Sequence, residues 1–324
     1  METPKISIAS VTYRDVAQTE RFIDSVYATA SLPLEFIIVN NGSSELDVPL
    51  DMQCNMHPGL KVIRNVSNLG IGIAMEQAMR ACKTDYIFRA DSDVRLLSPG
   101  WDKEMCSYVD RFSEVGAVGT SITGGNFTPR RGALVSRSPS GQTPNTNGLL
   151  LSEGVGYIET DLCLSNFMLI HRRAIDAIAA KSLCELPRVQ KKVSEILSFG
   201  KSRWDGYFTQ LGGLVNYMTY HAGFWENTYQ YGADDFSYSM WIRFAGLRIA
   251  KAPKAQVYHK DDSLRPEWSE ERHRRVNLGF QQWRAEWEVL EDFFDVKSLD
   301  WDCWPMNKQY KEEQARVIKE QLHF

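Results

Sequence analysis

Short apolar runs alternate with helical patterns over residues 5–90, and this alternation limits the fold more than any other feature of the sequence. A helical stripe of apolar residues is expected at about 16–30, and a second helix is expected at 71–82. The apolar runs, which are rich in β-branched and aromatic residues, are 5–12, 34–39, 61–63 and 85–90. Strands that alternate with helices predict a doubly wound, mostly parallel α/β sheet with helices on both faces.

Polar residues follow three of the four predicted strands. The clusters are Thr12-Tyr13-Arg14, Asn40 to Ser44 and Asp91 to Asp93. In open α/β sheets, ligands bind at the carboxyl ends of the strands. The sequence therefore predicts that the three clusters line one binding site.

The second half of the chain has a less regular pattern. Gly, Ser, Thr, Pro and Asn dominate 121–156, and both a plain surface loop and a functional loop fit such a stretch. Residues 162–170 predict a further strand, and 236–244 predict a helix. The tail from Ser263 is charged, is expected to be helical, and holds five of the nine tryptophans.

Composition argues against some classes of protein. The net charge of −4 and the pI near 5.9 do not indicate a broad basic surface for nucleic acid. No apolar run approaches the ~20 residues that cross a bilayer, and no signal peptide precedes the first strand. The six cysteines form no C-x-x-C pair, so we interpret them as reduced thiols. We therefore expect a cytoplasmic protein without an integral membrane segment, in which any membrane contact is peripheral.

Asp91 and Asp93 form a D-x-D directly after a predicted buried strand. Two carboxylates this close repel each other unless a cation is present. Hard oxygen ligands suit Mg²⁺ or Mn²⁺, which proteins usually share with substrate phosphates. An exposed acidic turn is the alternative, and the position after an apolar strand favours the metal site.

Two positions in the second half of the chain add to the D-x-D. Asp235 ends the run Gly232-Ala233-Asp234-Asp235 before a predicted helix, where a carboxylate serves either as a helix cap or as a general base. His259 ends a short strand-like segment, where it is either a structural residue or a ligand for a divalent ion.

Six motifs in order resemble those of the inverting GT-A glycosyltransferases of the large family-two type, over residues 5–260. They are a strand ending in Thr12-Tyr13, the turn Val39-Asn40-Asn41-Gly42-Ser43, the helix start Asn68 to Ala74, the D-x-D, Asp235 eleven residues before Gly246, and Pro253-x-x-x-Val257-x-His259. The resemblance implies a GT-A fold, a nucleotide-diphosphate-sugar donor, Mn²⁺ or Mg²⁺ as cofactor, and inverting transfer to an acceptor hydroxyl. It divides the chain into a nucleotide-sugar-binding half at 1–117, an acceptor-binding half of the same domain at 118–262, and a helical extension at 263–324.

The resemblance also implies a role for individual residues. The donor would be bound by residues at the ends of the strands and in the loops after them, namely Thr12, Tyr13, Arg14, Asn40, Asn68, Gly70, Asp91 and Ser92. The metal ligands would be Asp91, Asp93 and His259. Asp235 would be the general base. The acceptor would be held by Asp234 and would stack on Trp204 and Trp225, unless these two tryptophans belong to the core.

Some features depart from the family and leave alternatives open. Asn40 stands where the family usually has an Asp that reads the base, so the base of the donor is undetermined. The acceptor is expected to be a glycan, a lipid-linked sugar or, less in keeping with the net charge, a hydroxylated base in DNA, which the arginines of 121–156 and the basic run 272–275 permit. A noncatalytic sugar-binding protein on the same fold is a further alternative. A nucleotidyltransferase would need a glycine-rich basic loop, which 11–15 does not supply.

Overall fold

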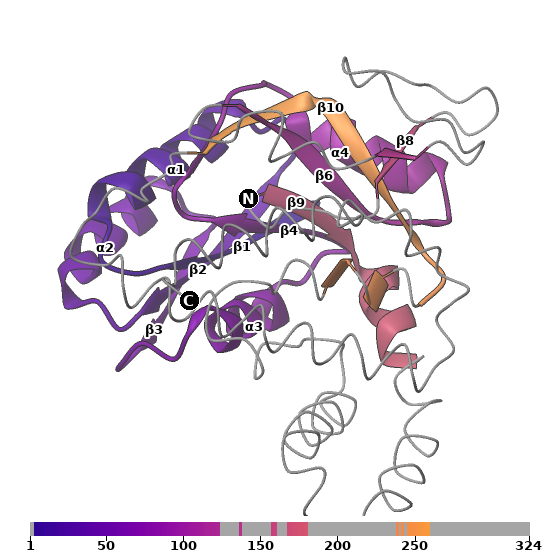
Figure 1. Ribbon diagram of the computed structural model, residues 1–324. Helices are drawn as coiled ribbons and strands as arrows, with labels where there is room; N and C mark the ends of the chain where they lie inside the picture. The colour runs from indigo at the N-terminus through magenta and orange to yellow at the C-terminus, as the bar shows by residue number, and fades with distance from the viewer. Residues whose placement is uncertain are drawn as a thin grey trace, which may run out of the picture.

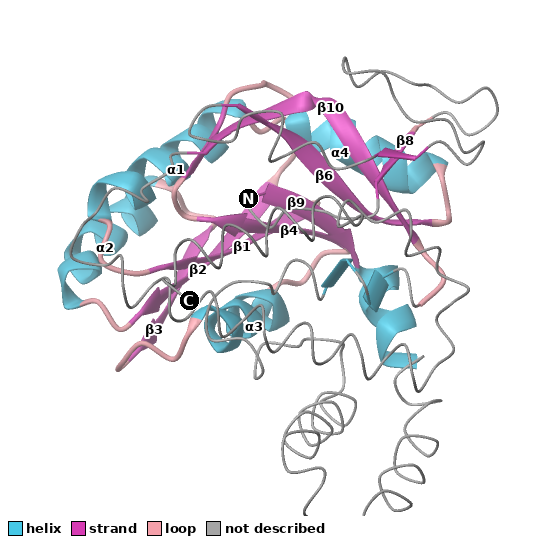
Figure 2. Cartoon of the chain, viewed as in Figure 1, coloured by secondary structure: helices cyan, strands magenta, loops and turns pink. Residues whose placement is uncertain are grey.

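The chain folds around one sheet with helices on both faces (Figure 1, Figure 2). The structure is a computed structural model that describes residues 3–123, 136–137, 157–160, 167–180, 238–239, 241–242 and 245–259. The helical extension predicted at 263–324 lies outside these residues, as does most of 121–156.

The amino-terminal half of the sheet is parallel. Its strands are β1 (Ile6–Thr12), β2 (Leu34–Asn41), β3 (Leu60–Asn65) and β4 (Tyr86–Asp91). The connecting elements are α1 (Val16–Thr29), the 3-10 turn η1 (Ser44–Leu46), α2 (Asp47–Met56) and α3 (Ile71–Ala81). The four predicted strands and both predicted helices are confirmed, while η1 and α2 are not among the predicted elements.

The carboxyl-terminal half of the sheet is mixed. Its elements are β5 (Val94–Leu96), α4 (Trp101–Arg111), β6 (Val115–Thr123), β7 (Ser136–Arg137), β8 (Ile158–Thr160), β9 (Phe167–His171) and β10 (Arg248–His259). The strand order is β3-β2-β1-β4-β9-β6-β10-β8-β7, and β5 pairs with β10. The strand predicted within 162–170 is confirmed as β9, which lies antiparallel between β4 and β6. Its direction could not be predicted, because an apolar run carries no information about the direction of pairing.

Two apolar layers enclose the sheet. On one face, the α1 residues Phe22, Ile23 and Val26 pack against the sheet in a core that also contains Trp101 of α4. The Trp101 ring lies edge-on to Phe88 of β4, with 4.8 Å between the ring centroids. Each fully buried side chain of this size contributes about 1.5–3 kcal/mol to folding. α3 covers the other face, where its buried residues are Gly72, Ala74, Met75, Glu76, Ala78 and Met79.

Side chains along β4 alternate between these two layers. Phe88 and Ala90 belong to the core under α1 and α4. Arg89 and Asp91 therefore point to the face that α3 covers. The alternation therefore sets the direction of Asp91, the first residue of the predicted D-x-D.

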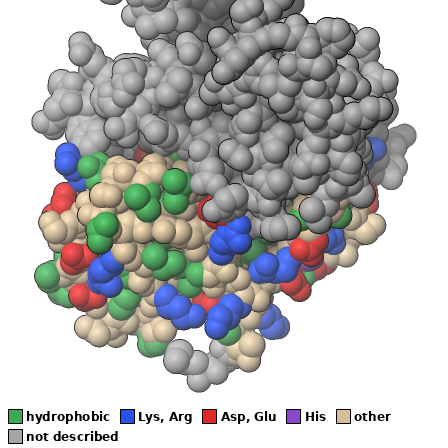
Figure 3. Space-filling model, turned by 90° about the horizontal axis from the view of Figure 1, so that it is seen from below, with side chains coloured by type: hydrophobic (Ala, Val, Ile, Leu, Met, Phe, Trp, Pro, Cys, Tyr) green, Lys and Arg blue, Asp and Glu red, His purple; other side chains and the backbone are tan. Residues whose placement is uncertain are grey.

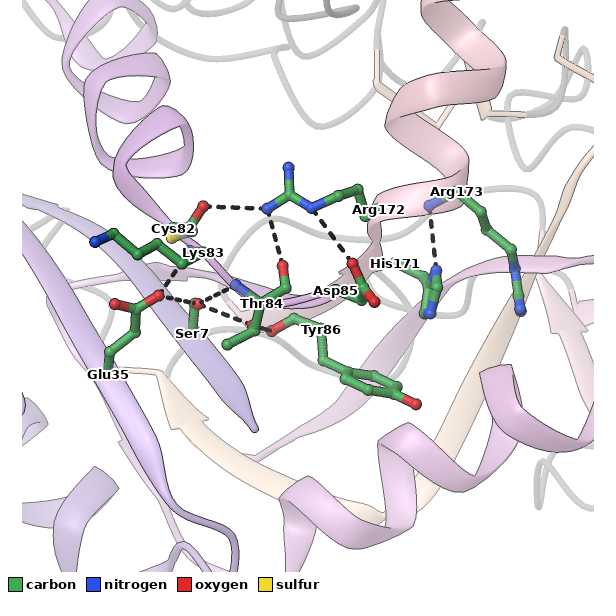
Figure 4. A network of polar contacts seen from close by, with 10 residues as sticks. All are labelled: Ser7, Glu35, Cys82, Lys83, Thr84, Asp85, Tyr86, His171, Arg172 and Arg173. Carbon is green, nitrogen blue, oxygen red and sulfur yellow. Dashed lines mark hydrogen bonds and ion pairs between the residues drawn. The ribbon is translucent and has the colours of Figure 1, made fainter. Parts of the chain in front are cut away.

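A polar network joins the amino ends of the parallel strands (Figure 4). The buried Glu35 carboxylate accepts hydrogen bonds from Ser7 Oγ at 2.7 Å, from the Lys83 N–H at 2.7 Å and from Lys61 Nζ at 3.1 Å. Arg172 Nη2 donates to the carbonyl oxygens of Cys82 and Thr84, just past the end of α3, at 3.1 and 2.9 Å. The network ties β1, β2, α3 and the residues after β9 together at the end of the sheet away from the predicted site.

Candidate active site

Three predicted ligands meet at the carboxyl end of β4. Asp91 ends β4, and Asp93 lies two residues further on, before β5. β5 pairs antiparallel with the end of β10, where His259 faces Val94. The ligand atoms of Asp91, Asp93 and His259 all lie within 4.8 Å of one another. The structure therefore brings together residues that are far apart in the chain, and Ser92 lies in the turn between the two aspartates.

The side chains in this cluster fit a divalent cation. Asp93 Oδ1 is buried and accepts no hydrogen bond in the described part of the chain, although His259 Nε2 lies 3.4 Å from it. Most buried polar atoms in proteins have a hydrogen-bond partner, so an acceptor without a donor is an unusual feature. Two carboxylates and one imidazole form a ligand set that suits Mn²⁺ or Mg²⁺. The roles of Asp91, Asp93 and His259 as metal ligands stay a prediction.

The turn after β1 contains a strained residue. Arg14 has a φ of 64°, in the left-handed region that residues with a side chain seldom adopt. Its N–H donates to Ser43 Oγ at 2.9 Å, and its guanidinium lies 4.9 Å from the centre of the Tyr13 ring. Strained backbone conformations of this kind are concentrated at functional sites.

Thr12 and Asn40, both predicted to bind the donor, are buried and bonded within the protein. Thr12 Oγ1 shares a hydrogen bond with Thr19 Oγ1 of α1. Asn40 Nδ2 donates to the Ser43 carbonyl and to Asp47 Oδ1, and its Oδ1 accepts from the Ser43 N–H. An asparagine amide offers two donor and two acceptor positions, and three of the four are used by Asn40 within the described residues.

Asn41 is a residue of the candidate site that was not among the predicted site residues. Its Oδ1 accepts from Asn65 Nδ2 and the Leu69 N–H, and its Nδ2 donates to Asn68 Oδ1 and the Gly70 carbonyl. All four positions of the amide are used, at distances of 3.0–3.1 Å. Asn41 thereby fixes the loop 66–70, which includes the predicted donor-binding residues Asn68 and Gly70. Strand alternation, which turns Asn41 toward α3, is the signal that could have identified it.

Gly42 lets the same loop approach closely. A Cβ at Gly42 would lie 2.4 Å from the carbonyl carbon of Ser67, and the φ of Gly42 is 86°. Only glycine combines this conformation with such an approach. The turn after β2 and the loop before α3 therefore form one rigid unit at the carboxyl end of the sheet.

Four predicted residues cannot be placed. Asp234, Asp235, Trp204 and Trp225 lie outside the described residues, so the general base and the acceptor site stay predictions. Residues 238–239 and 241–242 are helical, which agrees with the helix predicted at 236–244. Gly246, the last glycine of the motif series, has a φ of 83° just before β10.

The surface of the described part carries charges of both signs. Figure 3 shows a face on which Lys and Arg side chains run across the middle, with Asp and Glu between them and on both sides. Duplex DNA is typically bound by a surface on which basic residues cluster, and this face has mixed charge instead. None of the described helices is long and apolar enough to cross a membrane.

Comparisons with known proteins bear on the family of the chain and on its fold. The sequence model described as "Glycosyl transferase family 2" matches residues 7–177. A curated relative from Haemophilus influenzae, called "Uncharacterized glycosyltransferase", is 24% identical over 120 residues, which is 37% of this chain and 37% of that protein. The chain therefore matches little more than a third of the length of that relative.

Two solved structures have a similar fold. One is the mannosyltransferase PcManGT from Pyrobaculum calidifontis in complex with GDP-Man and Mn²⁺, with a TM-score of 0.53 and 13% identity over 99% of this chain and 87% of that one. The other is GalNAc-T7 with UDP, GalNAc and Mn²⁺, with a TM-score of 0.53 and 13% identity over 80% of this chain and 44% of that one. At this level of identity the similarity concerns the fold alone.

Proposed function

We propose that this chain, which belongs to glycosyl transferase family 2, transfers a sugar from a nucleoside-diphosphate donor to an acceptor hydroxyl. Its fold is of the GT-A type. The observation that carries the proposal is the meeting of Asp91, Asp93 and His259 at the carboxyl ends of the strands, where sheets of this kind bind ligands.

Asp91, Asp93 and His259 would hold a divalent cation in this reaction. Mn²⁺ or Mg²⁺ bound there would offset the negative charge that builds on the departing diphosphate. Mn²⁺ is present in both similar solved structures, which supports the assignment. Those two structures hold different nucleotides, GDP-Man in one and UDP in the other, so we propose the donor only as a class.

The nucleoside would lie against the rigid unit formed by the turns after β1 and β2 and the loop 66–70. Tyr13 offers an aromatic ring, and Arg14 offers a cation for the base or the phosphates. Asn41 holds the loop that carries Asn68 and Gly70. These residues would bind and orient the donor before any chemical step.

Asp235 would accept the proton of the acceptor hydroxyl. The hydroxyl oxygen forms a bond to the anomeric carbon from the face opposite the diphosphate. The bond to the diphosphate breaks at the same time, and the diphosphate leaves with the electron pair. The anomeric centre is inverted as a result, with Asp234, Trp204 and Trp225 holding the acceptor.

Donor binding tests the proposal. The apparent stability of the full chain would be measured with UDP-, GDP- and dTDP-sugars, each with Mn²⁺ and with EDTA. A ligand that binds only the folded state raises the stability of that state. One of these donors should therefore stabilise the chain with Mn²⁺ and not with EDTA. Asp93→Ala should remove this effect without unfolding the chain. Equal binding in EDTA would contradict the metal role, and the absence of any donor effect would contradict the transferase itself.

Turnover separates the enzyme from its noncatalytic alternative. A transferase should release the nucleoside diphosphate from its donor in Mn²⁺, with transfer to water when no acceptor is present. A donor that binds without ever being cleaved, with any glycan acceptor added, would indicate a sugar-binding protein on the same fold.

A further inference from the structure

An exposed apolar stripe runs along α2. Its residues Val48, Met52 and Met56 are 69, 60 and 57% exposed. Residues four apart lie on the same face of a helix, so the three side chains form one row. The buried residues of α2 are Leu50 and Gln53. The helix therefore presents more large apolar side chains to solvent than to the core.

This distribution differs from that of the other helices. A surface helix normally turns its apolar residues toward the core, as α1 does with Phe22, Ile23 and Val26. Of the six large apolar side chains that are exposed in the described part of the chain, three belong to the stripe on α2. Contiguous apolar surface of this kind marks a site of interaction, and methionine is common at such sites because its side chain adapts to different partners.

The stripe lies at the outer edge of the fold. α2 packs beside α1 and against β3, and β3 is the last strand at one end of the sheet. Figure 1 shows α2 at the left edge of the molecule, beyond α1. A second molecule can therefore approach the stripe from beyond the end of the sheet.

We propose that two copies of this chain form a two-fold dimer through α2. The dimer is independent of the proposed function, because neither the donor nor the metal takes part in it. The stripe is spaced evenly about Met52. A two-fold axis at Met52 places this residue against its own copy, and places Val48 against Met56 of the second copy. Such self-complementarity is what a closed dimer requires, because both copies use the same surface.

The spacing also fits the way in which helices pack. Residues at intervals of four form a ridge, and two ridges of this kind interlock with the helix axes inclined by about 50°, the commonest geometry in globular proteins. The ten residues of α2 span about 15 Å. The contact is therefore small, and we expect weak association that appears as the concentration rises through the micromolar range.

The charges beside the stripe favour a second copy over other partners. Asp47 and Asp51 each precede a stripe residue by one position, and Arg64 of β3 donates to both carboxylates. A two-fold axis across the helix brings this flank against the same flank of the second copy, in the opposite direction. Carboxylates and a guanidinium then face a surface that also carries both signs. An anionic lipid surface would instead meet the exposed carboxylates.

Sedimentation velocity of the full chain tests the dimer over the micromolar range. The wild type should change from monomer to dimer as its concentration rises. Met52→Asp should weaken the association at least about tenfold, because two like charges would face each other across the axis. Met52 is exposed, so urea denaturation of the variant should give the same midpoint as the wild type.

Two further variants test the symmetry of the contact. Met52→Lys alone should weaken the association as Met52→Asp does. An equimolar mixture of Met52→Asp and Met52→Lys should form a dimer again, since opposite charges then meet on the axis. Leu97→Asp is the matched control: it adds the same charge at an exposed apolar side chain outside the stripe and should leave the dimer unchanged.

Several outcomes would overturn the proposal. One is a wild type that stays monomeric at every concentration. Another is a dimer that Met52→Asp leaves intact, or that Leu97→Asp weakens equally, because the contact would then not be specific to α2. A mixture of the two Met52 variants that stays monomeric would exclude the two-fold arrangement. Vesicles of phosphatidylcholine and phosphatidylserine provide the last test: if they bind a monomeric wild type but not Met52→Asp, the stripe is a membrane surface instead.

Discussion

The two ends of the parallel strands both carry a carboxylate with a buried oxygen, but the two carboxylates are in opposite states. At the amino end, Glu35 receives hydrogen bonds from Ser7, the Lys83 N–H and Lys61 (Figure 4). At the carboxyl end, Asp93 Oδ1 is also buried and receives none within the described part of the chain. The carboxylate at the amino end is hydrogen-bonded within the protein, whereas the buried oxygen at the carboxyl end is an acceptor that suits a cation. Polar groups at the first end should therefore contribute to stability, and those at the second to binding and catalysis.

The largest expected effect at the carboxyl end concerns Asp235. A general base typically contributes about 10²–10⁴-fold to a rate, so Asp235→Asn should lower turnover by that factor. The free energy of unfolding should barely change, because asparagine is nearly isosteric and also caps helices well. Steady-state kinetics and urea denaturation measure the two quantities.

The neighbouring carboxylate provides the control for this prediction. Asp234→Asn should act mainly through acceptor affinity. Near-normal turnover of Asp235→Asn with an inactive Asp234→Asn would reverse the two roles. If both variants stay active, the pair is only a helix cap.

Asn41 lies at the carboxyl end of the strands but, like Glu35, is hydrogen-bonded within the protein. Its replacement tests whether an effect on stability can be separated from an effect on nucleotide binding. In Asn41→Asp, an oxygen replaces the amide nitrogen that donates to Asn68 Oδ1 and the Gly70 carbonyl. The new carboxylate oxygen would then face two other acceptor oxygens, which costs about 1–3 kcal/mol of stability. We also expect nucleotide affinity to fall with little change in kcat, since the loop 66–70 would move. Lower stability with unchanged nucleotide affinity would show that this loop does not contact the donor.

Glu35 is the matching test at the amino end. Glu35→Ala leaves buried donors without a partner and should cost about 1–3 kcal/mol. Nucleotide affinity should stay at the wild-type value, since the network lies at the far end of the strands. Lys61→Met is the control: the Lys61 side chain is 54% exposed, and such pairs contribute about 1 kcal/mol or less. A loss of nucleotide binding in Glu35→Ala would contradict the separation of the two ends.

The acid stability of the fold should depend on the same carboxylate. Burial opposes ionisation of Glu35, but the hydrogen bonds from Ser7, Lys83 and Lys61 outweigh burial and lower its pKa. A lowered pKa in the folded state stabilises the fold above the unfolded value of about 4.3. That contribution is lost as the pH falls through the folded pKa. Urea denaturation between neutral pH and pH 3 should show a smaller acid-induced loss in Glu35→Gln than in the wild type.

The sequence predicted the parallel half of the fold closely and the mixed half only in part. β1 and β4 were predictable because they are buried runs of β-branched and aromatic residues. α4 was missed, although its buried Trp101, Met105 and Val109 recur at every fourth position. The pairing of β5 with β10 could not be predicted, since it joins segments that lie about half of the chain apart.

The candidate site, like the fold, could be predicted only in part from the sequence. Asp91, Asp93 and His259 were found through short motifs, but their meeting depends on that long-range pairing. The four hydrogen bonds of Asn41 depend on the position of a loop that no local pattern specifies. Arg89 gave no signal in the sequence, because its burial beside Asp91 appears only when β4 is enclosed by its neighbours.

The smallest expected effect concerns Arg14, whose backbone is strained at the carboxyl end of the strands. A left-handed backbone with a side chain costs about 1–3 kcal/mol, and the bond from its N–H to Ser43 helps to hold it. Arg14→Gly removes this strain but adds about 0.5–1 kcal/mol of chain entropy to lose on folding, so the net gain is small. Arg14→Ala keeps a Cβ and therefore the strain, so it should be less stable than Arg14→Gly by about 1 kcal/mol.

Both variants lose the guanidinium over Tyr13, so both should bind nucleotide equally weakly. Titration with nucleoside, monophosphate and diphosphate shows which part of the donor Arg14 contacts. If either variant retains full affinity for all three, Arg14 is strained for a reason other than donor binding.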